Sequence, residues 1–120
     1  MNTASRRPSL HPLAEIAWLT TTVDAEAQAR ELARAGVEAR LAACAQVEAI
    51  VSHYWWEGAL QESAEWRITW KTTPRQLDAL QAQLAPLHPY ELPQWTHGLC
   101  GAAQAYAQWV AQQVAPRPQA

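Results

Sequence analysis

The sequence contains few cysteines, a single lysine and no long apolar run, and each shortage argues against a class of protein. Its two cysteines, Cys44 and Cys100, have no paired spacing, so we expect no disulfide framework and a cytoplasmic, reducing location. No run approaches the ~18 apolar residues of a membrane span. Lys71 is the only lysine and the net charge is −2, so the clustered basic face of a nucleic-acid-binding protein is missing.

Motifs of the common catalytic sites are also absent. The sequence holds no glycine-rich phosphate loop, no Ser-His-Asp order and no paired-carboxylate site. Cys44 begins a predicted strand, and no sequence feature places a base beside it. We interpret it as a small buried residue, with a cysteine hydrolase as the alternative. The chain is therefore predicted not to be an enzyme.

The 120 residues, 49% of them apolar, are enough for one domain and too few for two. We predict a disordered N-terminal tail over residues 1–13, a folded domain over 14–115 and a disordered C-terminal tail over 116–120. Within the domain the residue patterns predict a strand at 16–22, a helix capped by Asp24, strands at 45–56 and 62–72 joined by a glycine turn, a helix from Pro74 to near His88, a short strand at 94–96, and a helix at 102–114.

This β-α-β-β-α-β order, followed by an extra helix, predicts an α+β fold of the ferredoxin-like sandwich type. In the third strand, Trp66, Ile68 and Trp70 alternate with Glu65, Arg67 and Lys71, so the tryptophans and the charges occupy opposite faces. The helix after Pro74 is expected to bury one leucine stripe, made of Leu77, Leu80, Leu84 and Leu87. The last helix is expected to turn three residues inward, namely Tyr106, Trp109 and Val110.

The predicted hairpin is too long for one chain of this size to cover. Each arm has about eleven residues, or roughly 36 Å, against a domain diameter of about 35 Å. Its far end carries Tyr54, Trp55 and Trp56, whose exposure to water is unfavourable. We therefore predict a homo-oligomer with the hairpins at its interfaces; the alternative is that these tryptophans belong to a monomeric core.

Several motifs in order make the chain resemble the CutA family of divalent-cation tolerance proteins, over about residues 16–114. They are "LAAC" at 41–44, the pattern S-x-Y-x-W-x-G on Ser52, Tyr54, Trp56 and Gly58, Glu65 before "KTT" at 71–73, "HPYELP" at 88–93, and Tyr106 with Trp109. The resemblance implies a ferredoxin-like fold in a tight trimer, similar in shape to PII-like signalling trimers. It also implies a link to copper and other divalent metals.

Three positions depart from the family pattern. Thr20 lies near the place where members with a proposed copper site carry a cysteine, and Leu87 replaces the first of two histidines found in some members. The fourth strand is expected to be truncated, because "THGLCG" follows Pro93 almost at once. These departures weaken the metal assignment relative to the fold.

Three residues are candidate metal ligands. His88 is the first, because imidazole binds copper and zinc and a trimer can combine ligands from several chains. The alternative is that His88 ends the preceding helix by bonding its free carbonyls. His97 and Cys100 have H-x-x-C spacing, although a flexible glycine loop is the favoured interpretation there.

Five residues are expected at the trimer interface or its cleft: Tyr54, Trp56, Glu65, Lys71 and Tyr90. Charges on that strand face could hold an anionic ligand or a metal, and the alternative is an inter-subunit network of ion pairs. The resulting hypothesis is a non-enzymatic, trimeric divalent-metal tolerance protein that binds Cu²⁺ or another divalent cation, none of them tightly. The second hypothesis is a PII-like module that senses a small ligand or acts as a scaffold, without metal dependence.

Overall fold

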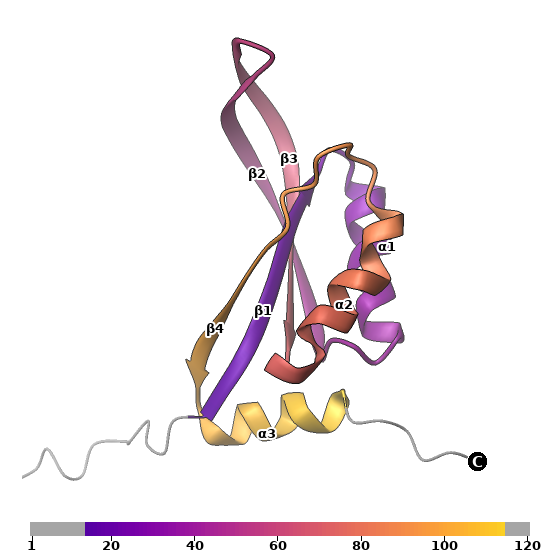
Figure 1. The fold of residues 1–120 in the computed structure, drawn as a ribbon, viewed down its shortest axis with the longest axis vertical. Helices are drawn as coiled ribbons and strands as arrows, with labels where there is room; N and C mark the ends of the chain where they lie inside the picture. Colours follow the sequence, from indigo (N-terminus) through magenta and orange to yellow (C-terminus); the bar gives the residue numbers. More distant parts are fainter. Residues whose placement is uncertain (1–13, 115–120) are drawn as a thin grey trace, which may run out of the picture.

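The computed structural model describes residues 14–114 and shows an α+β fold, which confirms the predicted class (Figure 1). Its elements are β1 (Ala14–Val23), α1 (Glu26–Glu38), β2 (Cys44–Trp56), β3 (Ala59–Thr72), α2 (Leu77–Leu84), β4 (Thr96–Ala102) and α3 (Gln104–Gln113), with 3₁₀ turns η2 (Pro74–Gln76) and η3 (Ala85–Leu87) on either side of α2. The predicted tails lie outside the described residues. No helix within 14–114 has the length and apolar character needed to cross a membrane.

The four strands form one antiparallel sheet in the order β2-β3-β1-β4. Helices α1 and α2 cover one face of this sheet. Helix α3 lies across the end of the sheet where β1 begins and β4 ends (Figure 1). Strand β3 is central: residues 66–72 pair with β1, and residues 59–71 pair with β2. The antiparallel pairing of β2 with β3 confirms the long hairpin predicted from the sequence.

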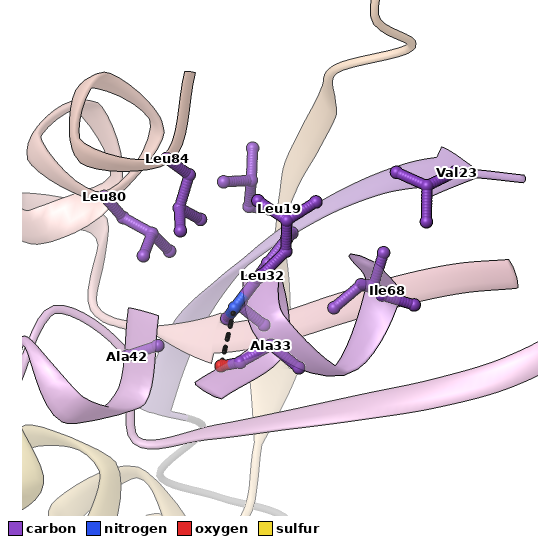
Figure 2. Close-up of a cluster of buried hydrophobic side chains, with 10 residues drawn as sticks. Leu19, Val23, Leu32, Ala33, Ala42, Ile68, Leu80 and Leu84 are labelled. Carbon is purple, nitrogen blue, oxygen red and sulfur yellow. Dashed lines mark hydrogen bonds between the residues drawn. The ribbon is translucent and has the colours of Figure 1, made fainter. Parts of the chain in front are cut away.

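The main core lies between the sheet and the two helices α1 and α2 (Figure 2). Ile68 and Trp70 are fully buried there and Trp66 packs against them, as the alternation in β3 predicts. The Trp70 indole Nε1 donates a hydrogen bond to the Ala33 carbonyl, 3.3 Å away, so the largest buried side chain also has its polar atom satisfied. Gly36 makes this approach possible, because a Cβ there would come within 2.8 Å of the indole Nε1.

Two predictions about the helices are wrong in detail. Asp24 does not cap α1: the N-cap is Ala25, which has extended backbone and no side-chain cap bond. In the leucine stripe, Leu80 and Leu84 are fully buried but Leu87 is 47% exposed. Leu87 falls in the 3₁₀ turn η3 beyond the end of α2, so the α-helical period that defined the stripe no longer applies to it.

The fourth strand is not truncated, and the glycine-rich segment is not a loop. Strand β4 pairs with β1 from Ala14 opposite Ala102 to Thr20 opposite Thr96. The indole of Trp18 lies directly over Gly98, where a Cβ would approach a ring carbon to 2.6 Å. Glycine is present at this position because a neighbouring side chain needs the space, which is an established role for glycine inside strands.

The last helix, α3, is also oriented differently from the prediction. Val110 and Val114 pack on Ile16 and Ala43 in a second, smaller apolar cluster. Ile16 and Leu19 point to opposite faces of β1, so this cluster lies on the face away from α1 and α2. Of the three residues predicted to face inward, only Val110 does; Tyr106 and Trp109 are 38% and 41% exposed, and their rings stack at 5.7 Å.

The β2–β3 hairpin extends well beyond the rest of the sheet (Figure 1). Residues 59–65 of β3 have no β1 partner, so about 23 Å of ribbon is only two strands wide. Its turn is a tight one at Glu57 and Gly58, with φ angles of 49° and 78°, which is typical of a type I′ hairpin. Large apolar side chains along this ribbon are exposed, and the most open are Val51, Trp55 and Leu60.

Candidate functional site

A cleft of about 610 Å³ lies where the hairpin leaves the sheet. One wall is the overhanging part of the hairpin, from Ser52 to Trp56 beside the turn, and the other is the loop between α2 and β4. That loop passes the end of β1 (Figure 1). The lining residues are Thr22, Ser52, His53, Tyr54, Trp56, Glu65, Pro89, Tyr90, Glu91, Leu92 and Gln94.

Strand alternation places the polar and aromatic groups of the first wall. Ser52, Tyr54 and Trp56 are two residues apart on β2 and therefore share one face. Glu65 belongs to the same face of β3, opposite Ile50. This is the face that α1 and α2 leave uncovered within one chain.

Tyr90 connects the loop to the hairpin. Its hydroxyl donates a hydrogen bond of 2.7 Å to Oε2 of Glu65. Glu65 is only 8% exposed. Burial first, and then the bond to Glu65 and its charge, raise the pKa of Tyr90 well above its ordinary 10.0. The phenol therefore stays protonated at physiological pH and keeps donating to the carboxylate.

His88 fixes the loop just before Tyr90. Its Nδ1 accepts a hydrogen bond from the Tyr90 backbone N–H at 3.1 Å, and its Nε2 lies 2.8 Å from Oγ1 of Thr21. Since Nδ1 is an acceptor, the neutral ring carries its proton on Nε2 and donates it to Thr21. Burial lowers the pKa of His88 below its ordinary 6.5, against a smaller opposing effect of a hydrogen bond with the Thr22 backbone.

Both ring nitrogens of His88 are thus already bonded within the chain. A metal ion could bind His88 only by displacing Thr21 or the Tyr90 N–H. The residue does follow a helical turn, as the alternative interpretation assumed, and its own backbone N–H bonds the Ala85 carbonyl at 3.2 Å. The ring, however, fixes the loop after the turn, and does not cap the helix carbonyls.

The structure does not bring the other two metal candidates together. His97 and Cys100 are three residues apart on the extended strand β4, so their side chains point to opposite faces of the sheet. Cys100 packs on the small cluster around Ile16, while His97 is exposed. Within residues 14–114 there is no group of three or more His, Cys, Asp or Glu side chains placed to hold a metal ion.

Of the five residues expected at the trimer interface or its cleft, four line this cleft within one chain, namely Tyr54, Trp56, Glu65 and Tyr90. Lys71 does not, because it lies six residues further along β3 than Glu65, or about 20 Å. There it pairs with Trp18 on one side and Cys44 on the other. The strand face carrying Glu65, Arg67 and Lys71 is therefore a long stripe of separate charges, and only its first member lines the cleft. Arg67 pairs with Glu48 at 3.1 Å.

The cysteines lie at the far end of the same face. Cys44 Sγ is 3.6 Å from the Tyr106 hydroxyl, and burial, followed by this contact, raises the pKa of Tyr106 to about 12. Cys44 and Cys100 belong to the two outer strands of the sheet, about 14 Å apart. That separation is too large for a disulfide within one chain.

Sequence reasoning missed several residues of the cleft. Ser52 could have been found, because it shares strand parity with Tyr54 and Trp56. Glu91, Leu92 and Gln94 could not, because they lie in a loop whose path depends on contacts between distant residues. One such contact is the hydrogen bond from Thr22 Oγ1 to Gln94 Oε1 at 3.3 Å.

The fold and the cleft together define a small α+β protein with an antiparallel sheet, an overhanging hairpin and a cleft along one side of that hairpin. The family model of the CutA1 divalent ion tolerance protein matches residues 17–113, and the chain belongs to that family.

Individual relatives agree with this assignment. The divalent-cation tolerance protein CutA of Thermotoga maritima is 40% identical over 73 residues, which cover 61% of this chain and 72% of that protein. The structure of CutA from Synechococcus elongatus is 39% identical with a TM-score of 0.81, and covers 88% of this chain and 98% of that one. A structure of CutA from the same organism complexed with a Bis-Tris molecule has 40% identity and a TM-score of 0.76, covering 83% of this chain and 94% of that one.

Proposed function

We propose that the chain is a non-enzymatic divalent-cation tolerance protein that works as a homotrimer and binds Cu²⁺ or another divalent cation weakly. The observation that carries this proposal is the hairpin. Its ribbon exposes Val51, Trp55 and Leu60 at 61%, 73% and 65%, which one chain cannot cover. A second and third copy would bury this apolar surface, at about 25 cal/mol per Å² of area removed from water.

The fold supports the same assembly. The strand order β2-β3-β1-β4 and the two α-helices on one face are those of a ferredoxin-like sandwich, with α3 added. Strand β2 is an open edge along its whole length, and an edge of this kind pairs readily with another chain. The PII-like shape that the sequence resemblance implies depends on this same strand order and helix placement.

Weak cation binding agrees with the ligands available in one chain. His88 Nδ1 is free for a metal only when the Tyr90 N–H bond opens. Glu65 and Glu91 offer carboxylate oxygens in the cleft nearby. Divalent copper prefers several nitrogen or oxygen donors, so a site of this composition would be filled only at high cation concentration.

Two measurements test this proposal. Light scattering on a dilute solution should report a trimer, and a stable species of 13.3 kDa would rule the assembly out. Copper calorimetry should show weak binding that His88→Ala reduces about tenfold, with His97→Ala, also a histidine loss but at an exposed strand position, as the matched control. Equal affinity in wild type and His88→Ala would remove His88 from the site.

A second candidate function is the binding of a small organic ligand in the cleft. It is favoured by the volume of about 610 Å³, by the aromatic and carboxylate lining, and by the Bis-Tris complex of a 40% identical relative. A thermal-shift screen of metabolites and small amines should raise the melting temperature with at least one compound. A flat response across the screen would argue against ligand sensing.

We also propose a cytoplasmic location. Two unpaired cysteines that lie too far apart to bridge are typical of a reducing compartment. Fractionation of cells producing the tagged chain tests this, and recovery in an exported fraction would contradict it.

A further inference from the structure

We propose that α3 acts as a hinged cover over the thiols of Cys44 and Cys100, and that the contact of Arg40 with Gln113 keeps this cover closed. Neither Arg40 nor Gln113 is among the residues expected at the trimer interface, and their contact is complete within one chain. Three features support the proposal: the backbone conformation of Arg40, the small number of contacts that hold α3, and the position of the two thiols.

Arg40 has a backbone conformation that an arginine rarely adopts. Its φ angle is 61°, in the left-handed region, at the second position after the last residue of α1. Its N–H donates to the Val37 carbonyl at 3.0 Å, where the chain turns from α1 towards β2. Glycine is the usual residue at such a position, because it has no Cβ to oppose the left-handed conformation. The contacts of the Arg40 side chain give a physical reason for an arginine there.

The guanidinium of Arg40 reaches the end of α3. Its Nη1 donates to the backbone carbonyl and to the side-chain Oε1 of Gln113, each at 3.3 Å. The last turn of α3 holds no basic residue, so Arg40 supplies the positive charge that stabilises a helix C-terminus. A cavity of about 380 Å³ beside this contact is lined by residues of both α1 and α3. The two helix ends are therefore not tightly packed, and Arg40 bridges them.

The other contacts that hold α3 are few. Val110 is the only buried residue of the helix, and it belongs to the smaller apolar cluster. Among residues 14–114, hydrogen bonds join α3 to the rest of the chain at Arg40 and Cys44 only. The N-cap, Ala103, makes no side-chain bond, and ten residues are too few for a stable isolated helix. Since Ala103 alone separates α3 from β4, the helix can pivot there once its far end is released.

Both thiols lie against this helix. Cys44 Sγ is 3.6 Å from the Tyr106 hydroxyl, and Cys100 packs on the smaller apolar cluster that includes Val110. Each cysteine is half-buried, and the sequence holds no other. Thiolates bind soft metal ions and react with electrophiles. Movement of α3 away from the sheet would therefore expose both groups to such reagents, and the Arg40 contact sets how often that happens.

Arg40→Gly separates the side-chain contact from the backbone strain. It removes the guanidinium but gives the turn the residue that its φ angle favours, so amide exchange in α1 should stay the same or slow. Exchange in α3 should nevertheless become about threefold to tenfold faster, because the far end of that helix is released. Hydrogen exchange on the full chain, followed by mass spectrometry of its peptides, measures both helices in one experiment.

Arg34→Ala is the matched control. It also removes an exposed arginine near the end of α1, but the partner of Arg34 is Glu38, within α1 itself. Exchange in α3 should then change less than about twofold. Gln113→Ala removes only the side-chain acceptor of the contact. It should speed exchange in α3 less than Arg40→Gly does, and the two changes combined should have no more effect than Arg40→Gly alone.

Iodoacetamide tests access to the thiols. The thiolate sulfur bonds to the carbon of the reagent and displaces iodide, so no oxidant is needed. Under native conditions at neutral pH, Cys44 and Cys100 should be alkylated about threefold to tenfold faster in Arg40→Gly than in wild type or Arg34→Ala. Mass spectrometry of the two cysteine peptides measures the rates separately.

Three outcomes would overturn the inference. Unchanged α3 exchange in Arg40→Gly would show that Arg40 does not hold the helix, and equally faster exchange in α1 and α3 would show a general loss of stability instead. Faster exchange in α3 without faster alkylation would reject its role as a cover. Should Arg40→Gly fail to fold, Arg40→Lys, which keeps the charge but loses the planar fork, takes its place with an expected change of about twofold to threefold. Light scattering reports the trimer separately, so the proposed assembly is tested independently.

Discussion

The hydroxyl of Tyr90 and the carboxylate of Glu65, 25 positions apart in sequence, are joined by a hydrogen bond of 2.7 Å across the cleft. Replacing Tyr90 by Phe leaves the buried carboxylate without this donor. We expect Tyr90→Phe to lower the free energy of unfolding by about 1–3 kcal/mol. Urea unfolding at fixed protein concentration measures it.

Tyr54→Phe is the control for that change. The Tyr54 hydroxyl accepts a bond from Ser63 at 3.2 Å, but both groups are exposed, so its loss should cost about 0.5 kcal/mol or less. Similar losses in the two variants would mean that the Tyr90 bond has no special role.

A second prediction concerns the close contact of Trp18 with Gly98. Alanine at residue 98 would place a Cβ 2.6 Å from the indole and force it to move. We expect Gly98→Ala to destabilise the protein by about 1–3 kcal/mol. Gly101→Ala, on the same strand with no atom within 4 Å of the new Cβ, should be close to neutral. Thermal unfolding of the pair provides the comparison, and equal midpoints would contradict the packing described for β4.

The leucines of α2 and η3 give a third prediction. Leu84 is fully buried, so Leu84→Ala should cost about 2–5 kcal/mol from lost burial and the cavity left behind. Leu87 is nearly half exposed, and Leu87→Ala should cost less than about 1 kcal/mol. Denaturant unfolding of both variants tests this, and a large loss at Leu87 would show that another chain covers it.

His88 gives a pH dependence with a defined sign. Because burial lowers its pKa below the ordinary 6.5, the folded protein binds this proton less readily than the unfolded chain does. The stability contributed by neutral His88 is therefore complete above pH 6.5 and is lost as the pH falls through the lower, folded pKa. Protonation places a hydrogen on Nδ1, where it opposes the Tyr90 N–H.

The measurement is the unfolding free energy of wild type and His88→Gln between neutral and mildly acidic pH. The difference between the two should shrink as the pH falls, with a slope of at most about 1.4 kcal/mol per pH unit for one group. A difference that stays constant over this range would show that the His88 ring does not titrate in the way its contacts imply.

Much of the fold could be predicted because its signals are local. The alternation of Trp66, Ile68 and Trp70 fixes the buried face of β3, and the glycine turn fixes the hairpin. Strand β4 was mispredicted because Gly98 looks like a loop residue until its contact with Trp18 is known. The predicted orientation of α3 was wrong because its aromatic residues were assumed to face inward, whereas Val110 is the residue that packs against Ile16 and Ala43.

The candidate site was half predictable. Tyr54 and Trp56 share a face by strand parity, so they could be grouped from the sequence alone. Their partner across the cleft, Tyr90, lies in a loop, and His88 sets its position through Thr21 in a distant strand. Contacts of that kind depend on the packed tertiary structure, and no local pattern encodes them.

Because the hairpin overhangs the sheet, we expect the conformational order of its tip to depend on the protein concentration. Near the sheet, β3 is held by a neighbour on each side, but residues 59–65 are held by β2 alone. A two-stranded ribbon is marginal in water, so its tip gains lasting protection only when another copy lies against it. Amide hydrogen exchange at the tip should therefore report assembly. Its rate should fall as subunits associate, while the exchange rate at the base of the same strands stays unchanged.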